Sequence, residues 1–250
     1  LHHLLTAGQI ELDRIFPGIV DDMVTEGAFK VDMAAQYRIR LGGEWKKPGT
    51  GDIEIVCAGR PLMEWCVRRR LDDEPRIGYR HESAAADLLH DRENNAVIGV
   101  VVDRDGETEM VPAEFVVDAS GKNTRVPEFL ERNGIGAPEV EQDIINCFYS
   151  TMQHRVPAER QWQDKVMMIC YAYRPYEDTY AAQYYTDSTR TILSTTLVAY
   201  NCYSPPRTAQ EFREFAKLMP SPVVGENIDG LEPDSPIYNF RYPNMLRLRY

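Results

Sequence analysis

The chain has 250 residues, 43% of them hydrophobic, which is enough for one large domain or two modest domains with a sizeable core. Its formal net charge of −11 argues against a nucleic-acid surface and an anionic membrane patch, because both require clustered Lys and Arg. No apolar run approaches the ~20 residues of a membrane span, and no signal peptide is recognisable.

The first part of the chain predicts helices and short strands. Residues 1–27 have apolar side chains at helical spacing, and Pro17-Gly18 divides them into two helices. Residues 59–73 predict a further helix, because Pro61 suits a first helical turn and three consecutive arginines suit the C-terminal end of a helix dipole. Strands are predicted between these helices, at residues 29–41 and 52–57.

Residues 76–118 predict an antiparallel meander, with the segments RENN and DRDG as its turns. The meander leads into a last strand at residues 115–118, and we expect Val116 and Val117 to lie in the centre of a sheet. A missing neighbour would leave an unpaired sheet edge, through which the chain would self-associate. A short helix follows and stops at Gly134.

Beyond about residue 140 the pattern is mostly that of an antiparallel sheet, with segments rich in aromatic and β-branched residues. One helix interrupts it, in the segment TAQEFREFAKLM, where Thr208 and Glu211 have the spacing of a capping box. The chain therefore combines an α/β first half with an antiparallel β second half, and the boundary is predicted near residue 138.

The segment EFVVDASGKNTR places small residues directly after the predicted strand at 115–118. Ligands of open α/β sheets bind outside the carboxyl ends of the strands, and small side chains allow close approach to the backbone. The candidate ligand-binding residues are Asp118, Ala119, Ser120 and Gly121. An ordinary strand-to-helix turn is the alternative interpretation of this segment.

Arg60 opens the predicted helix at 59–73, just after a strand-like segment, so its guanidinium could reach a phosphate bound over the sheet. The alternative is an ordinary surface arginine. Eight of the 14 tyrosines lie between Tyr171 and Tyr203, and Tyr173 and Tyr184 are candidates for the wall of an apolar substrate pocket. A half-buried sheet face explains the same tyrosines equally well.

The sequence nominates no catalytic residue and no metal ligand. It contains neither a GxSxG nucleophile elbow nor an HExxH zinc motif. Its five cysteines are scattered without a CxxC pair, which predicts reduced thiols in a cytoplasmic protein rather than disulfides or a zinc site.

The order and spacing of three segments, FPGIVDDMVTEGAFKVD, GRPLMEWCVRRRL and VVDASGKNTRVPEFLERNG, resemble one known superfamily. It is the superfamily of FAD-dependent monooxygenases and oxidoreductases built like p-hydroxybenzoate hydroxylase. The segments LHHLL and LEPDSPIYNFRYPNMLRLRY are similar to its branch of polyether-type epoxidases and bacterial oxidoreductases. The resemblance covers essentially the whole chain.

This resemblance implies a fold class of α/β plus antiparallel β. Residues 1–138 would form part of a Rossmann-like FAD-binding domain, and residues 139–250 a substrate-binding sheet. It also implies that Asp118–Gly121 lie under the adenosine of FAD, that the backbone around Ala85 holds the adenine, and that Arg60 contacts the cofactor near its pyrophosphate or ribityl chain. The flavin would carry the redox chemistry on a small apolar molecule, with NAD(P)H as a possible reductant.

The chain departs from the superfamily pattern in two places. The 250 residues lack the superfamily's N-terminal GxGxxG unit. They also lack the superfamily's second flavin motif, a Gly-Asp followed by Pro and glycines. We therefore expect an internal fragment that binds FAD weakly or not at all. A flavin halogenase is disfavoured because W-x-W-x-I is missing, whereas a reductase of polyprenyl chains and a non-catalytic binding domain stay open.

Overall fold

The computed structural model describes residues 2–51, 53–171, 179–201 and 204–249. It is a mixed α/β structure with antiparallel and mixed sheets, as the sequence predicted. The chain divides into two compact units, which we call unit 1 (Leu1–Glu74 with Ile144–Asn244) and unit 2 (Pro75–Asp143 with Met245–Tyr250). Residues 1–74 thus fold with the sheet formed by the second half of the chain and not with the meander. The division into an FAD-binding domain at residues 1–138 and a substrate-binding sheet at residues 139–250 stays a prediction.

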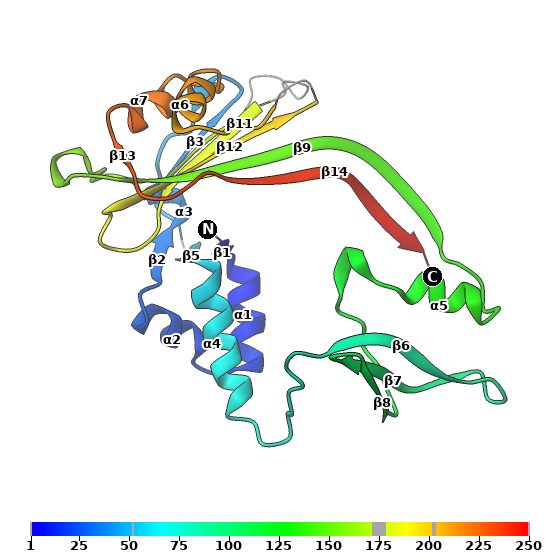
Figure 1. Ribbon diagram of the computed structural model, residues 1–250. Helices are drawn as coiled ribbons and strands as arrows, with labels where there is room; N and C mark the ends of the chain where they lie inside the picture. The colour runs from blue at the N-terminus through cyan, green and yellow to red at the C-terminus, as the bar shows by residue number, and fades with distance from the viewer. Residues whose placement is uncertain (1, 52, 172–178, 202–203, 250) are drawn as a thin grey trace. The chain divides into compact units, whose positions relative to one another are not determined.

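Unit 1 is built on a mixed sheet that eight strands form within the described residues (Figure 1). The strand order is β13-β9-β12-β11-β10-β3-β4, with β14 paired to β9. Neighbours in the order from β13 to β4 are antiparallel except for β3 with β10, which run parallel. The strands are β3 (Tyr37–Leu41), β4 (Glu44–Trp45), β9 (Glu139–Arg155), β10 (Met167–Cys170), β11 (Thr179–Tyr185), β12 (Ile192–Tyr200), β13 (Glu232–Pro233) and β14 (Tyr238–Arg249).

Helices α6 (Ala209–Lys217) and α7 (Val223–Ile228) cover one face of this sheet (Figure 1). Their apolar side chains Phe212, Val224 and Ile228 are fully buried against it. The predicted cap of α6 is present, because the Thr208 hydroxyl accepts a hydrogen bond from the Glu211 amide at 3.1 Å. A short 3-10 turn, Ala158–Arg160, lies between β9 and β10.

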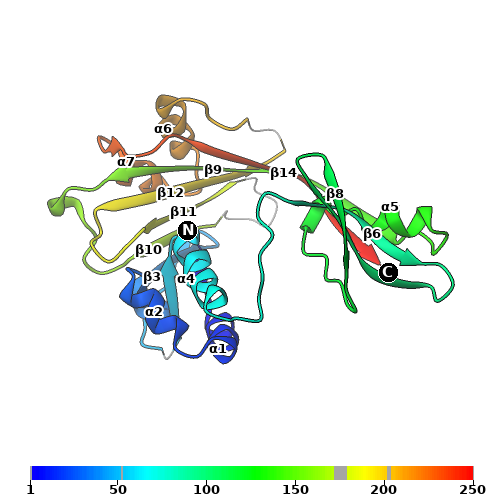
Figure 2. The same cartoon turned by 60° about the horizontal axis from the view of Figure 1, so that its bottom comes forward.

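A second, antiparallel sheet of unit 1 has the order β1-β5-β2, with β1 (His2–Leu4), β2 (Phe29–Asp32) and β5 (Glu54–Ala58). Helices α1 (Thr6–Ile15), α2 (Ile19–Thr25) and α4 (Arg60–Asp72) pack beside it around buried Ile19, Met23 and Cys66 (Figure 2). The prediction of helix from residue 1 was wrong, because residues 2–4 pair with β5 instead.

The predicted strand at residues 29–41 is also interrupted. Helix α3 (Met33–Gln36) separates β2 from β3, and the Asp32 carboxylate caps it by accepting hydrogen bonds from the amides of Ala34 and Ala35. A good N-cap residue inside a strand-like segment can start a helical turn, since it satisfies amides that a strand would otherwise pair.

Unit 2 contains the predicted meander, formed by β6 (Ala84–Asp91), β7 (Ala96–Arg104) and β8 (Glu107–Pro112). A 3-10 turn (Gly121–Asn123) and helix α5 (Val126–Arg132) follow. The prediction of a central strand at residues 115–118 was wrong, because no strand among the described residues pairs with this segment. Phe115 and Val117 are 82% and 74% exposed.

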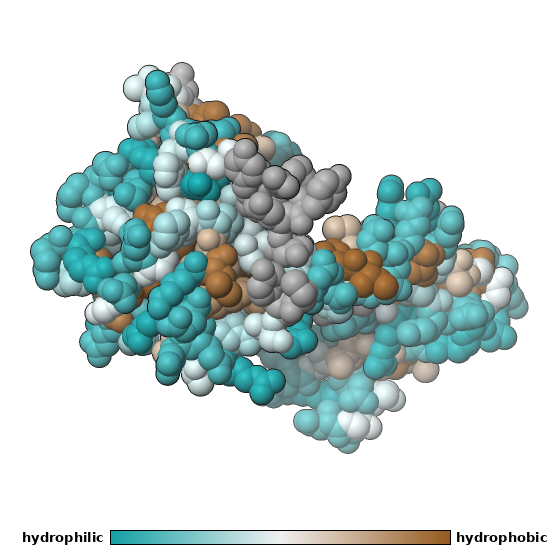
Figure 3. Space-filling model, turned by 90° about the horizontal axis from the view of Figure 1, so that it is seen from above, coloured by the Kyte–Doolittle hydropathy of each residue, from teal (hydrophilic) through white to brown (hydrophobic). Residues whose placement is uncertain are grey.

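On the face drawn in Figure 3, apolar patches interrupt a mostly hydrophilic surface. The composition of residues 115–118 suits a strand, but a strand also needs a neighbour for its backbone hydrogen bonds. Self-association through this unpaired segment stays a prediction.

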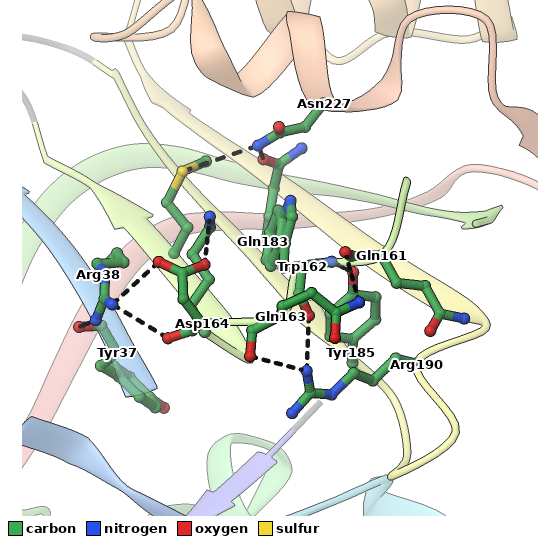
Figure 4. A network of polar contacts seen from close by, with 12 residues as sticks. Tyr37, Arg38, Gln161, Trp162, Gln163, Asp164, Gln183, Tyr185, Arg190 and Asn227 are labelled. Carbon is green, nitrogen blue, oxygen red and sulfur yellow. Dashed lines mark hydrogen bonds and ion pairs between the residues drawn. The ribbon is translucent and has the colours of Figure 1, made fainter. Parts of the chain in front are cut away.

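A polar network fastens the loop at residues 161–165 to the sheet of unit 1 (Figure 4). The Tyr185 hydroxyl accepts a hydrogen bond from the Trp162 amide at 2.7 Å, and the Arg190 guanidinium donates to the Trp162 carbonyl at 2.6 Å. Farther in, the fully buried amide of Gln183 donates to the Val224 carbonyl at 3.0 Å and accepts from Asn227 at 2.9 Å. The network thereby ties the loop and α7 to the strands.

We predict that Tyr185→Phe lowers the free energy of unfolding by about 1 kcal/mol, because the Trp162 amide loses its acceptor while the ring packing is kept. Urea denaturation followed by tryptophan fluorescence measures this change. Tyr238→Phe is the control, since Tyr238 is 59% exposed. Equal denaturation midpoints for Tyr185→Phe and the unmodified chain would contradict the prediction.

Candidate functional site

A cavity of about 490 Å³, open to solvent on one side, lies at the surface of unit 2 between the meander and the segment that leads into α5. This volume falls within the range of small-molecule sites, roughly 300–1,000 Å³. The lining is mostly apolar, with polar groups at Asp87, Asp103, Asp118, Ser120, Asn123 and Arg125. The apolar lining consists of Ala84, Ala85, Ala86, Leu88, Val100, Val116, Val117, Val126 and Phe129.

The alanines at the start of β6 form a small-residue wall of this cavity. Ala85 pairs with Val102 and Asp87 pairs with the next residue, Val101, so Ala86 is an extra residue in a bulge of β6. Bulges redirect side chains locally and are common beside binding sites. Arg132 of α5 donates to both carboxylate oxygens of Asp87, at 2.6 and 2.7 Å, which ties the helix to this end of the strand.

The opposite wall is the turn after the unpaired segment. The Asp118 carboxylate closes it by accepting hydrogen bonds from the Ser120 amide, at 2.9 Å, and from the Thr124 hydroxyl. Hydrogen bonding from the Ser120 side chain, then from Thr124 and the Ser120 amide, lowers the pKa of Asp118, so the side chain is a carboxylate at neutral pH. Gly121 has a φ of +67°, a conformation that residues with a Cβ adopt at a cost.

The fold brings several of the predicted ligand residues together. Ala85, Asp118 and Ser120 line the same cavity. Gly121 lines a neighbouring cavity of about 510 Å³, which shares Val116 and Asp118 with the first. Ala119 is exposed and lines neither.

Arg60 belongs to unit 1, so its relation to this cavity stays a prediction. It is the first residue of α4, where it forms an exposed ion pair with Glu64 one helical turn later. Such an exposed pair contributes little to stability, so the guanidinium can exchange it for another anion at small cost.

Sequence interpretation missed four polar residues of the cavity, which are Asp87, Asp103, Asn123 and Arg125. Asn123 and Arg125 follow Gly121 closely, so the tight turn that exposes Asp118 also brings them to the same space. Arg125 is exposed and adds a guanidinium to a site otherwise bordered by acids. The sequence signal that could have identified Arg125 is its position four residues after Gly121, because a tight turn brings such a side chain back towards the end of the preceding segment.

The two tyrosines proposed as a pocket wall have different outcomes. Tyr173 lies outside the described residues. Tyr184 is only 5% exposed and is a member of the core of unit 1, where its hydroxyl accepts a hydrogen bond from Ser194 at 2.9 Å. A pocket role for Tyr184 stays a prediction.

Four other tyrosines form a continuous row, which we call the tyrosine row (Tyr149, Tyr171, Tyr180 and Tyr242). Tyr180 and Tyr149 flank Val198 across three adjacent strands. Their hydroxyls are 3.3 Å apart and their rings meet edge to face; Tyr171 stacks on Tyr180 at 5.9 Å, and Tyr242 contacts Tyr149 at 6.5 Å.

The tyrosine row lies on the sheet face opposite α6 and α7. Phe148, the neighbour of Tyr149 in β9, contacts Phe215 of α6 with ring centroids 5.7 Å apart, and successive residues of a strand point to opposite faces. Burial is the main reason why the pKa of Tyr180 is raised, so its hydroxyl is neutral at physiological pH. The row therefore presents flat rings that carry hydroxyl groups.

Among the residues that the structure describes, no group of three or more His, Cys, Asp or Glu side chains could hold a metal ion. Within the same residues, no helix is long and apolar enough to cross a membrane.

The chain is similar to several flavin-dependent enzymes in structure. It superimposes on the flavin-dependent brominase Bmp2 with a TM-score of 0.66 at 14% identity, covering 95% of this chain and 56% of the brominase. It superimposes on CtdE in complex with FAD and substrate 4 with a TM-score of 0.62 at 8% identity, covering 96% of this chain and 58% of CtdE. On p-nitrophenol 4-monooxygenase PnpA from Pseudomonas putida DLL-E4 the TM-score is 0.54 at 16% identity, covering 95% of this chain and 56% of PnpA.

In sequence, the chain is 30% identical over 168 residues to Protein Rv3254 of Mycobacterium tuberculosis (strain ATCC 25618 / H37Rv), covering 63% of this chain and 35% of that protein. No protein-family model matches the chain. The chain spans little more than half the length of these structures, and the likeness shows that it shares their fold.

We predict that Gly121→Ala destabilises unit 2 by about 1–2 kcal/mol, because alanine must adopt the left-handed conformation that Gly121 has. Space is not limiting, since an added Cβ would meet no atom within 4 Å. Gly78→Ala is the matched control: an added Cβ there is equally free, and no left-handed φ is required. Thermal melts that are the same for both variants would contradict the assignment of strain to this turn.

Proposed function

We propose that the whole protein is an FAD-dependent oxidoreductase, specifically a monooxygenase that oxidises an apolar small molecule, and that this chain is its central portion. The observation that carries the proposal is the meeting of Ala85, Asp118 and Ser120 at one cavity of unit 2. The superfamily resemblance independently assigned these residues to the adenosine part of FAD. The fold likeness to flavin-dependent enzymes supports the same reading.

The residues around the cavity fit the adenosine half of FAD. The alanines of β6 and the valines beside them offer an apolar, small-residue surface suited to a flat base. The Asp118 carboxylate uses two of its acceptor positions on Ser120 and Thr124, and a carboxylate has about four, so it can still accept from sugar hydroxyls. Arg125 can neutralise a phosphate charge at the border of the cavity.

A bound FAD would supply the redox chemistry, in which NAD(P)H is oxidised, one atom of O₂ enters the substrate and the other leaves as water. The protein's own contribution is binding and orientation. Unit 2 would hold the adenosine, and Arg60 would contact the pyrophosphate or ribityl chain. The tyrosine row would form an apolar wall that positions the substrate and keeps water away from it. None of these tasks requires a protein nucleophile.

We predict that Arg60→Ala raises the FAD dissociation constant of the whole protein roughly ten- to a hundredfold, since a charge-assisted contact is worth about 1.5–3 kcal/mol. Arg60→Lys recovers only part of the affinity, because it lacks the planar guanidinium. Flavin fluorescence quenching measures the affinity. Arg92→Ala is the charge-matched control, in the exposed turn between β6 and β7.

The same titrations on the 250-residue chain should show weak FAD binding that Arg60→Ala leaves nearly unchanged. Unchanged affinity in the Arg60→Ala whole protein would make Arg60 an ordinary surface arginine. Tight binding by the 250-residue chain would refute the view that the site needs further segments.

We predict that Tyr171→Ala weakens binding of the uncharged apolar dye Nile red three- to tenfold, because an aromatic contact contributes about 0.5–1.5 kcal/mol. Its melting temperature should change little, since Tyr171 is 40% exposed. Tyr184→Ala should show the reverse, a lower melting temperature with nearly unchanged dye affinity, because its side chain is in the core. If dye affinity and melting temperature fall together in both variants, the tyrosine row is not part of the substrate site.

A further inference from the structure

His154 is a fully buried histidine near the end of β9, on the sheet face covered by α6. It pairs with Leu193 of β12 on one side and with Pro233 of β13 on the other. Its ring lies against Phe212 of α6, with ring centroids 6.1 Å apart. The imidazole is thus enclosed by three strands and a helix.

The ring is enclosed without polar partners. Neither ring nitrogen of His154 has a hydrogen-bond partner among the described residues, and the same holds for the Nε of Arg213. Arg213 lies on α6, next to Phe212, and its outer nitrogen donates to the Leu231 carbonyl at 3.4 Å. The helix that covers the ring therefore also carries a guanidinium, and the ring can itself become a cation.

In the described part of the chain, no acid on the elements around His154 would compensate a positive charge on its ring. Arg213 is the charged residue that acts on the ring, and its own positive charge disfavours protonation of His154. On β13 and just beyond it, Glu232 is exposed in register with Arg155, and Asp234 forms an ion pair with Arg155. The neighbouring residue on β12, Leu193, is apolar. A protonated His154 would thus be a buried charge without a compensating acid.

We infer that His154 makes the attachment of α6 to the sheet an acid-sensitive switch, in which protonation of the buried ring releases α6 and exposes the sheet face beneath it. No part of the proposed redox function requires this behaviour, and it would respond to pH whether or not a cofactor is bound. Release of α6 lets the imidazolium reach water and separates it from Arg213. The cost of burying the charged ring and its repulsion by Arg213 are thereby both removed.

The direction of the pH dependence follows from linkage. Burial, and then Arg213, lower the pKa of His154 from its ordinary value of 6.5 to about 4. A lowered histidine pKa means that α6 is fully held above pH ~6.5 and loses stability as the pH falls from there towards 4. Between pH 7 and pH 5, one such proton raises the equilibrium constant for release about twentyfold.

The test is hydrogen exchange of the 250-residue chain at pH 7 and pH 5, corrected for the intrinsic exchange rates. We expect the opening constants of α6 amides to rise about twentyfold, while α4 amides change less than about threefold. In His154→Leu the rise in α6 should disappear. In His81→Leu it should persist, because His81 is an exposed histidine outside unit 1. A rise in α6 that survives in His154→Leu, or no rise in the unmodified chain, would overturn the inference.

A second measurement needs no variant, in case His154→Leu does not fold. The ¹⁵N chemical shifts of the His154 ring in the unmodified chain should stay those of neutral imidazole while the folded signals persist down to pH 5. A normal titration midpoint near 6.5, with α6 signals unchanged, would show that the ring is protonated in place and would refute the switch.

Discussion

The register of the antiparallel strands β9, β12, β11 and β10 is the constraint on which unit 1 depends. Because side chains alternate between the two faces, it assigns Phe148 and His154 to the helix-covered side and Tyr149 to the other side. A slip of one residue would exchange the two sets and bury tyrosine hydroxyls under α6. The apolar face must be covered, and α6 and α7 cover it, so the opposite face is free to carry the tyrosine row.

In unit 2 a local hydrogen-bonded turn has the corresponding role. The Asp118 carboxylate holds Ser120 and Thr124, and this fixes where the chain reverses beside the alanines of β6. The cavity exists because small side chains form one wall and a closed turn forms the other. Its lining is mostly apolar with several polar groups, a combination that is common in small-molecule sites. The proposed cofactor role rests on that combination.

Local features were predictable from the sequence. The meander, the capped helix at Thr208 and the small-residue turn at Asp118 depend on neighbours within a few positions, and the structure has all three. The tyrosine row was not predictable, because it depends on the register between strands separated by dozens of residues. The strand expected at residues 115–118 failed for a related reason: composition shows that a segment suits a sheet but not whether a partner strand lies beside it.

The central claim is that the cavity of unit 2 holds the adenosine of FAD, and a crystal structure of the whole protein with FAD tests it most directly. The account predicts the adenine beside Ala85 and the ribose hydroxyls within hydrogen-bonding distance of the Asp118 carboxylate. A structure in which this cavity is filled by protein side chains, or in which FAD binds elsewhere with Asp118 making no contact to it, would contradict the account.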